Sequence, residues 1–412
     1  MGRTDESSHL HRWWGALGED IASRWNRLGR RLEEFPEVAG EALERHGRPE
    51  AEVALPVLQW LADGQLPRQH ERRTGFGQPA VTVFRDEGFS VDLLYWFDET
   101  ISIHDHRFGG AFTIVEGQSL QLVYDFEPGE ALSPGLSAGR LSCTRIETLH
   151  PGEVRLIPPG SGLVHSNVHF AFPAPTISLV VRTGSSGEEP QHFYSHGGLA
   201  FADREAPMET LKRLQGFGAS CRISREAGVE FLGRVLRDAA PRDALDYIGA
   251  ATSYFGTALY LDSLIAESPI GTSEETFGLV RRYVQQLQVS LAALVELTTL
   301  TDNESRLLLA LLAAGADWEM TDDLLRQLRP AQEPMVTLCG LVLQVVEQAG
   351  ASGRRSASSL SAEATHYLRA ASSGAGGAPS VPCPEGVATE LATHRLFGPL
   401  FRFALADLGQ PL

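Results

Sequence analysis

The amino-acid sequence predicts an α+β protein of several domains, in which short helices precede an antiparallel β-barrel or jelly roll and an all-helical bundle follows it. Three observations lead to this prediction. Between about residues 75 and 203, short β-branched and aromatic runs alternate with Gly, Pro and Asp at the near-regular spacing of antiparallel barrels. Before this region, and again after it, apolar residues recur at helical spacing.

The length of the chain sets the number of domains. At 412 residues it is too long for one compact core. We expect N-terminal helices over 1–74 that pack on the barrel, a barrel over 75–203 and a helical domain over 204–412. A net charge of −17 argues against a nucleic-acid partner, because phosphate binding needs clustered Lys and Arg.

Cysteine usage and apolar runs indicate the compartment. The four cysteines are scattered and form no Cys-x-x-Cys pair, so we expect reduced thiols in a cytoplasmic protein. The N-terminus lacks the basic-then-apolar layout of a signal peptide. The best apolar run, from Leu307 to Ala314, is too short to span a membrane, so no membrane partner is expected.

The N-terminal region has a helical pattern in two stretches. Its apolar residues predict one amphipathic helix from about residue 10 to 35, interrupted by Pro36, and a second over 53–61. The barrel region that follows contains nine candidate strands, over 79–85, 89–97, 101–106, 111–116, 118–125, 139–147, 153–157, 163–170 and 176–182.

After Asp203 the strand pattern disappears and helices are expected to the end of the chain. Capping boxes at Thr272-x-x-Glu275 and Thr301-x-x-Glu304 open two of them, and Thr321 begins a shorter one. Other helical stretches are expected around 229–236, 247–264, 335–347 and 385–408. Self-association or a partner protein could use this helical domain.

The most informative stretch of the barrel region is His104-Asp105-His106. On an extended strand, residues two apart point to one face, so both imidazoles project together while Asp105 turns away. His165 follows a Pro-Gly turn about sixty residues later, and a small barrel can bring it back beside the pair. Three neutral imidazoles suit iron, zinc, copper or nickel.

These residues carry a resemblance to a known family. Ile103 to His106, the strand Phe89 to Trp96, Glu116-Gly117 and the Gly162-Leu163 before His165 resemble the thiol dioxygenase branch of the cupins, typified by cysteine dioxygenase. The likeness covers about residues 76–200. It implies a cupin barrel in which His104, His106 and His165 hold one non-haem Fe(II), which uses O₂ to oxidise a small thiol.

Around the expected substrate, this sequence departs from the family. The family's cross-linking cysteine falls at Ala111, and its inward histidine and tyrosine read Val180 and Arg182. Its carboxylate-binding arginine has no clear match in the strand before the first histidine, where Arg85 lies at the turn. The substrate is therefore expected to be a small thiol or another small anion, with Arg182 and Arg85 as candidate binding residues.

Arg182 leaves two interpretations open. Strand parity puts Ser178, Val180 and Arg182 on the cavity side, and a buried unpaired guanidinium is costly. It could bind an anionic group of the substrate, because arginine suits bidentate contacts with carboxylates. It could instead form an internal salt bridge with Asp92 or Glu116.

Other side chains could contribute to the same site. His169 shares the strand parity of His165, and we expect it to lie beyond the metal rather than to bind it. His192 and His196 could form a lid at the barrel mouth or simply be solvated, and Tyr194 could place a phenol near the metal.

The sequence is compatible with two functions. The first is a mononuclear Fe(II) dioxygenase that acts on a small thiol or other small anion with O₂. The second is a non-catalytic cupin that binds or senses a small acid and signals to partners through its helical domain. Stoichiometric metal that depends on His104 and His165 would separate them.

Overall fold

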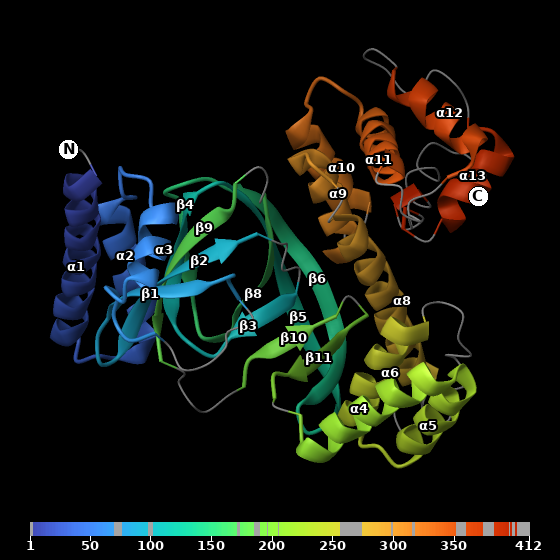
Figure 1. Cartoon of the computed structure of the whole chain (residues 1–412), viewed down its shortest axis with the longest axis horizontal. Coiled ribbons are helices and arrows are strands. Elements are labelled where there is room, and N and C mark those ends of the chain that lie inside the picture. The colour runs from blue at the N-terminus through green and yellow to red at the C-terminus, as the bar shows by residue number, and fades with distance from the viewer. Residues whose placement is uncertain are drawn as a thin grey trace. The chain divides into compact units, whose positions relative to one another are not determined.

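The computed structural model describes residues 3–69, 76–97, 102–170, 174–184, 190–195, 197–204, 206–255, 274–297, 300–314, 318–351, 360–373, 383–394, 396–397 and 400–401. N-terminal helices, a closed antiparallel barrel and C-terminal helices follow one another along the chain, which confirms the predicted fold class (Figure 1). The chain forms two compact units, one of residues 1–126 and 142–193 and another of residues 127–141 and 194–412.

The N-terminal helices lie side by side on the outer face of the first sheet (Figure 1). They are α1 (Arg3–Arg27), the 3₁₀ helix η1 (Leu32–Glu34), α2 (Phe35–His46) and α3 (Ala54–Ala62). The predicted single helix to residue 35 is wrong. Gly29 and Arg30 have φ of +69° and +55°, so the chain turns after Arg27. Pro36 lies in the first turn of α2 and does not end a helix, because the first turn needs no backbone N–H.

The first sheet has the strand order β1-β2-β9-β4-β7, with every pairing antiparallel. Its strands are β1 (Ala80–Arg85), β2 (Phe89–Trp96), β9 (Thr176–Thr183), β4 (Gly110–Glu116) and β7 (Val154–Ile157). Every residue of β2 is buried, because one face packs on the helices and the other faces the barrel interior. In the β2–β9 register, Ser90 lies opposite Arg182 and Asp92 opposite Val180.

The second set of strands closes in the order β10-β11-β6-β5-β8-β3. Its members are β3 (Ile103–His106), β5 (Ser119–Ser133), β6 (Leu136–Leu149), β8 (Gly160–His169), β10 (His192–Tyr194) and β11 (Leu199–Ala202). β5 continues to Ser133, past its predicted end at 125. β6 begins at Leu136, before its predicted start at 139. The strands β10 and β11 were not predicted, because three or four residues are too few to show a period of two.

The helices of the second unit are α4 (Met208–Ile223), α5 (Arg225–Arg237), α6 (Pro241–Phe255), α8 (Glu274–Leu297), α9 (Asn303–Ala314), α10 (Trp318–Leu328), α11 (Pro334–Ala351), α12 (Ala362–Ser372) and α13 (Glu385–Thr393). The predicted cap of α9 is wrong by one residue, since Asp302 Oδ1 accepts a hydrogen bond from Ser305 N at 2.8 Å. Thr321 is buried inside α10 and does not begin it. The predicted capping box at Thr272 lies outside the described residues.

Helix α11 is the most apolar long helix of the described chain. By length and composition alone its 18 residues could cross a membrane, which the run Leu307 to Ala314 could not. Of this window, 61% is buried inside the structure, where Leu338, Val342 and Val345 are at most 1% exposed. This burial is the pattern of a core helix.

Gly110 should be one of the least replaceable residues of the first sheet. A Cβ atom there would lie 2.0 Å from the backbone oxygen of Val181, which cannot move without shifting β9. We therefore expect Gly110→Ala to lower the free energy of unfolding by about 3 kcal/mol, measured by urea denaturation with tryptophan fluorescence. Gly15→Ala is the control, since nothing lies within 4 Å of that Cβ position in α1. Equal stability of the two variants would contradict the prediction.

Candidate metal centre and cavity

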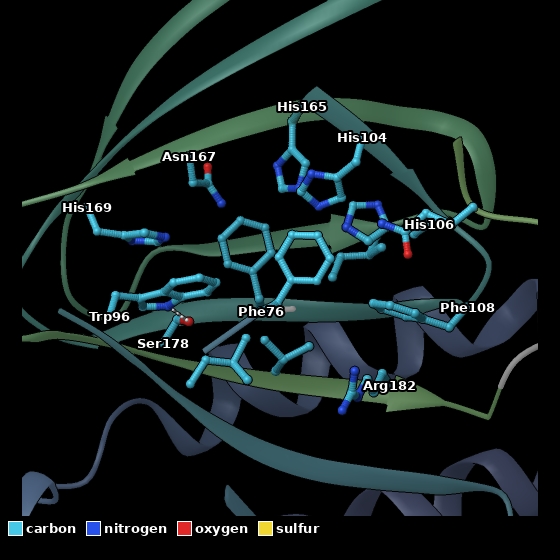
Figure 2. Close-up of a pocket in the computed structure, with 15 residues that line it drawn as sticks. Phe76, Trp96, His104, His106, Phe108, His165, Asn167, His169, Ser178 and Arg182 are labelled. Atoms are coloured by element: carbon cyan, nitrogen blue, oxygen red, sulfur yellow. Dashed lines mark hydrogen bonds between the residues drawn. The ribbon is translucent and has the colours of Figure 1, made fainter. Parts of the chain in front are cut away.

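The pairing of β3 with β8 brings the three histidines together. His104 lies directly opposite His165 in the antiparallel register, and His106 lies two residues further along β3. The register shifts between His104 and His106, where a β-bulge changes the pairing of the two strands. Two strands that are far apart in the sequence therefore present imidazoles to one point of the barrel interior (Figure 2).

The three rings form a symmetrical cluster. Each pair of ring centroids is 4.9 Å apart, and the possible ligand nitrogens all lie within 4.8 Å of one another. All three side chains are buried. Imidazoles with ligand nitrogens about 2.1 Å from one shared ion would have a similar ring separation. The residues therefore fit a single metal ion bound on one side by nitrogen.

Contacts of the outer ring nitrogens orient two of the rings. His104 Nδ1–H donates to the backbone oxygen of Ser102 at 2.9 Å, which leaves Nε2 as the ligand atom. The side-chain amide of Gln121 lies 2.7 Å from Nδ1 of His165, and its oxygen is buried without a partner. Half a turn of this amide would place that oxygen on Nδ1–H and free Nε2 of His165 for a metal.

Burial keeps these histidines neutral. It lowers the pKa of His104 to about 4, against a small opposing effect of the Ser102 carbonyl. Burial also holds the pKa values of His106 and His165 well below their usual range, helped by the neighbouring imidazoles. Only a neutral imidazole offers a lone pair to a metal, so the site is prepared for binding near neutral pH.

The histidines open onto a cavity of about 70 Å³ between the two sheets. Seven of its lining side chains are apolar, and five besides the three histidines are polar or charged. The lining residues besides the three histidines are Phe76, Leu94, Trp96, Phe108, Phe112, Ile157, Asn167, His169, Ser178, Val180, Arg182 and Gln191. Ser178, Val180 and Arg182 face the cavity together, as strand parity predicts.

Arg182 makes the internal salt bridge that was one of its two interpretations. Its Nε donates to Asp92 Oδ2 at 2.6 Å, and the Asp92 side chain is only 1% exposed. Hydroxyls of Thr82 and Ser90 also donate to Asp92. Glu116, the other possible partner, instead accepts a hydrogen bond from Val53 N. The pair uses only Nε, so the terminal Nη groups of Arg182 stay available beside Phe108.

Arg85 is not brought to the cavity. It is the exposed last residue of β1, and its Nη1 donates to the backbone oxygen of Arg68. The β1–β2 register shifts between Thr82 and Phe84, so the end of the strand is irregular and its side chain turns to the surface. Among the described residues, one arginine lines the cavity where the sequence suggested two.

The remaining sequence candidates lie in different places. His169 lines the cavity, but it is not part of the three-histidine cluster, as expected. His192 lies in β10, where its backbone N and ring Nδ1 donate to Asp105 at 2.6 and 3.1 Å. Tyr194 is buried but does not line the cavity, and His196 lies outside the described residues.

Sequence reasoning missed several residues of the site. Phe112 could have been found, because strand parity within 111–116 already places it on the opposite face of the strand from its two neighbours. Gln121 and Gln191 gave no signal, since their nearness to the histidines depends on how distant strands pair. Gln191 is 8% exposed, and its amide nitrogen is buried without a hydrogen-bond partner.

Comparisons with known proteins give only weak likenesses. No family model and no curated protein matches the chain. A double-stranded β-helix protein from Klebsiella pneumoniae is 16% identical over 38% of this chain and 100% of its own, with a TM-score of 0.20. A hydroquinone 1,2-dioxygenase from Sphingomonas with bound 4-hydroxybenzoate is 15% identical over 32% and 76%, at 0.20. A DMSP lyase from Ruegeria pomeroyi is 13% identical over 44% and 95%, at 0.23. At these TM-scores we conclude nothing about this chain from the three proteins.

Without metal, the barrel should lose stability as the pH falls from about 6.5 toward 4. The folded state binds protons at these histidines less readily than the unfolded chain, whose histidines titrate near 6.5. The contribution of these neutral histidines to the free energy of unfolding is therefore fully present above pH 6.5 and decreases below it. Burial lowers the pKa of His169 to about 3, so His169→Phe should reduce the slope by about 1.4 kcal/mol per pH unit.

This slope is measured by urea denaturation of the metal-free protein at several pH values. His150→Phe serves as the control for a His-to-Phe change, because His150 is exposed. If His169→Phe kept the wild-type slope, His169 would not be held neutral by burial.

Proposed function

We propose that the barrel is a cupin-type enzyme that holds one Fe(II) at His104, His106 and His165 and uses O₂ on a small anionic substrate. The observation that carries this proposal is the convergence of three buried, neutral imidazoles at the wall of a cavity that also contains an arginine. A cluster of this kind costs folding energy through burial of polar groups, and a bound ion would offset that cost.

The donor set leaves room for chemistry at the ion. Three histidines occupy one side, and the open side faces the cavity, where small molecules would have access. Imidazole ligands are compatible with several transition metals, and the resemblance to thiol dioxygenases favours iron among them. Bound Fe(II) would supply the one-electron and O₂ chemistry that side chains lack.

The residues of the chain would bind and orient the substrate. Arg182 is the charged group among the described residues that line the cavity. Asp92 fixes its guanidinium through Nε, so the Nη groups would contact a carboxylate without first losing rotational freedom. Phe76, Phe108 and Phe112 line the cavity beside the three histidines and would keep water away from them. The resemblance to thiol dioxygenases favours a substrate acid that also carries a thiol.

The metal content of the purified protein tests the proposed iron site. Wild-type protein loaded anaerobically with Fe(II) should bind about one ion per chain, measured by elemental analysis after desalting. His104→Ala and His165→Ala should each lower the affinity by about 100-fold or more, because two nitrogen ligands hold an ion poorly. Oxygen uptake with small thiol acids and non-thiol acids should be lost in parallel.

His150→Ala is the matched control, since this exposed histidine is not part of the three-histidine cluster and bonds to Gln118. Full iron binding by His165→Ala would contradict the proposed site. A folded barrel that binds no metal, yet binds a small acid, would support the non-catalytic sensor instead.

The role of Arg182 is tested with a double substitution. Arg182→Leu alone would remove the salt bridge of the buried Asp92 carboxylate, so it is combined with Asp92→Asn. We expect the double variant to bind small carboxylates about 10- to 100-fold more weakly, the loss of one charge-assisted contact. Its affinity for the corresponding uncharged amides should stay unchanged, as measured by calorimetry.

Arg140→Leu is the control, because Arg140 lies on the exposed β5–β6 hairpin and pairs with Glu127. If the double variant still preferred carboxylates over amides to the wild-type degree, the anion would bind elsewhere.

A further inference from the structure

The cavity has two polar ends that lie at opposite ends of the same strands. On β8 the cavity residues are His165, Asn167 and His169, and on β9 they are Ser178, Val180 and Arg182. Four residues of strand span about 13 Å, so each strand reaches from one end of the cavity to the other.

Contacts across the cavity show which ends match. Trp96 Nε1 donates to Ser178 Oγ at 2.9 Å, and the Trp96 ring stacks on His169 at 4.1 Å. At the other end, Arg182 lies over Phe108, whose ring centroid is 5.1 Å from that of His106. The arginine therefore belongs to the histidine-cluster end, and Asn167 and His169 form a separate polar end beside Trp96 (Figure 2).

Three polar atoms of this second end, two on Asn167 and one on His169, make no hydrogen bond to a described residue. Asn167 Oδ1 is buried without a hydrogen-bond partner, and no described residue bonds to its amide nitrogen, which points toward the cavity in Figure 2. His169 is 2% exposed and uses Nδ1 to contact Ser119 Oγ at 2.7 Å. Its Nε2 therefore stays available to a molecule in the cavity.

We propose that Asn167 and His169 form a second recognition site, which binds an uncharged hydroxyl at the end of the substrate opposite its anionic group. This inference rests on the proposed function for the place of the anionic end. No charged side chain lines this end among the described residues, so a second carboxylate or an ammonium group would be bound without a counter-charge. A hydroxyl both donates and accepts, and so satisfies an amide and an imidazole together.

The middle of the cavity agrees with such a substrate. Val180 lies between Ser178 and Arg182 on β9, and Phe112 is its partner in the β4–β9 register. Neither side chain offers a hydrogen bond. The substrate class is therefore a small acid with a short apolar body and a hydroxyl at its far end. A plain carboxylate would leave the Asn167 amide without a hydrogen-bond partner, which weakens its binding.

The test compares ω-hydroxycarboxylates of increasing chain length with the matching unsubstituted carboxylates. Binding to the wild-type protein is measured by calorimetry, with and without bound metal. At the chain length that spans the cavity, the hydroxyl should improve the dissociation constant by about 10-fold. In Asn167→Leu this preference should fall below about twofold, while affinity for the plain acid is retained.

His169→Phe provides a second variant, because phenylalanine keeps the stacking on Trp96 and removes Nε2. It should weaken the hydroxyl preference as well. Asn26→Leu, in the exposed part of α1, is the control for an Asn-to-Leu change and should leave the preference intact.

The outcomes separate this inference from the proposed function. A wild-type protein that binds iron and small acids but shows no hydroxyl preference at any chain length overturns the second recognition site alone. A hydroxyl preference that persists in both Asn167→Leu and His169→Phe also overturns it. A preference found in protein that binds no metal supports the second site and counts against the iron enzyme.

Discussion

The pairing of β3 with β8 is the constraint on which the site depends. Because side chains alternate along a strand, a slip of one residue in this pairing would turn His165 to the opposite face. The cluster would then lose one of its three nitrogens. The turn before β8 helps to set this register, since Gly160 adopts a φ of +66° that residues with a side chain rarely accept.

A second constraint lies on the facing sheet. Burying the Asp92–Arg182 pair costs desolvation energy, which the structure offsets with hydroxyl groups of Thr82 and Ser90 on the carboxylate. Such a pair adds little to stability by itself. Its effect is to hold a guanidinium at a fixed place in the cavity wall, with its terminal nitrogens beside Phe108.

The predictions from sequence that proved wrong share a cause, which is that a local signal was assigned to the wrong place in an element. Pro36 was interpreted as a helix interruption, yet it lies in the first turn of α2, because proline is acceptable in a first turn and unfavourable later. Thr301 and Asp302 are both good capping residues, and the packing of α9 decided between them. Arg85 has a suitable charge, but its strand ends at the surface.

The sequence alone determined the fold class, the helical and strand regions, and the faces of the strands. It placed His104 with His106, and Arg182 with Ser178, because the period of two along a strand is a local property of the chain. Only the tertiary structure decided which strands became neighbours. The pairing of β3 with β8 placed His165 beside His104 and His106. The position of β2 beside β9 paired Arg182 with Asp92 rather than Glu116. Strand pairing also placed the two polar groups of the cavity at its opposite ends. Strand pairing comes from burial summed over the whole barrel, which no short stretch of sequence encodes.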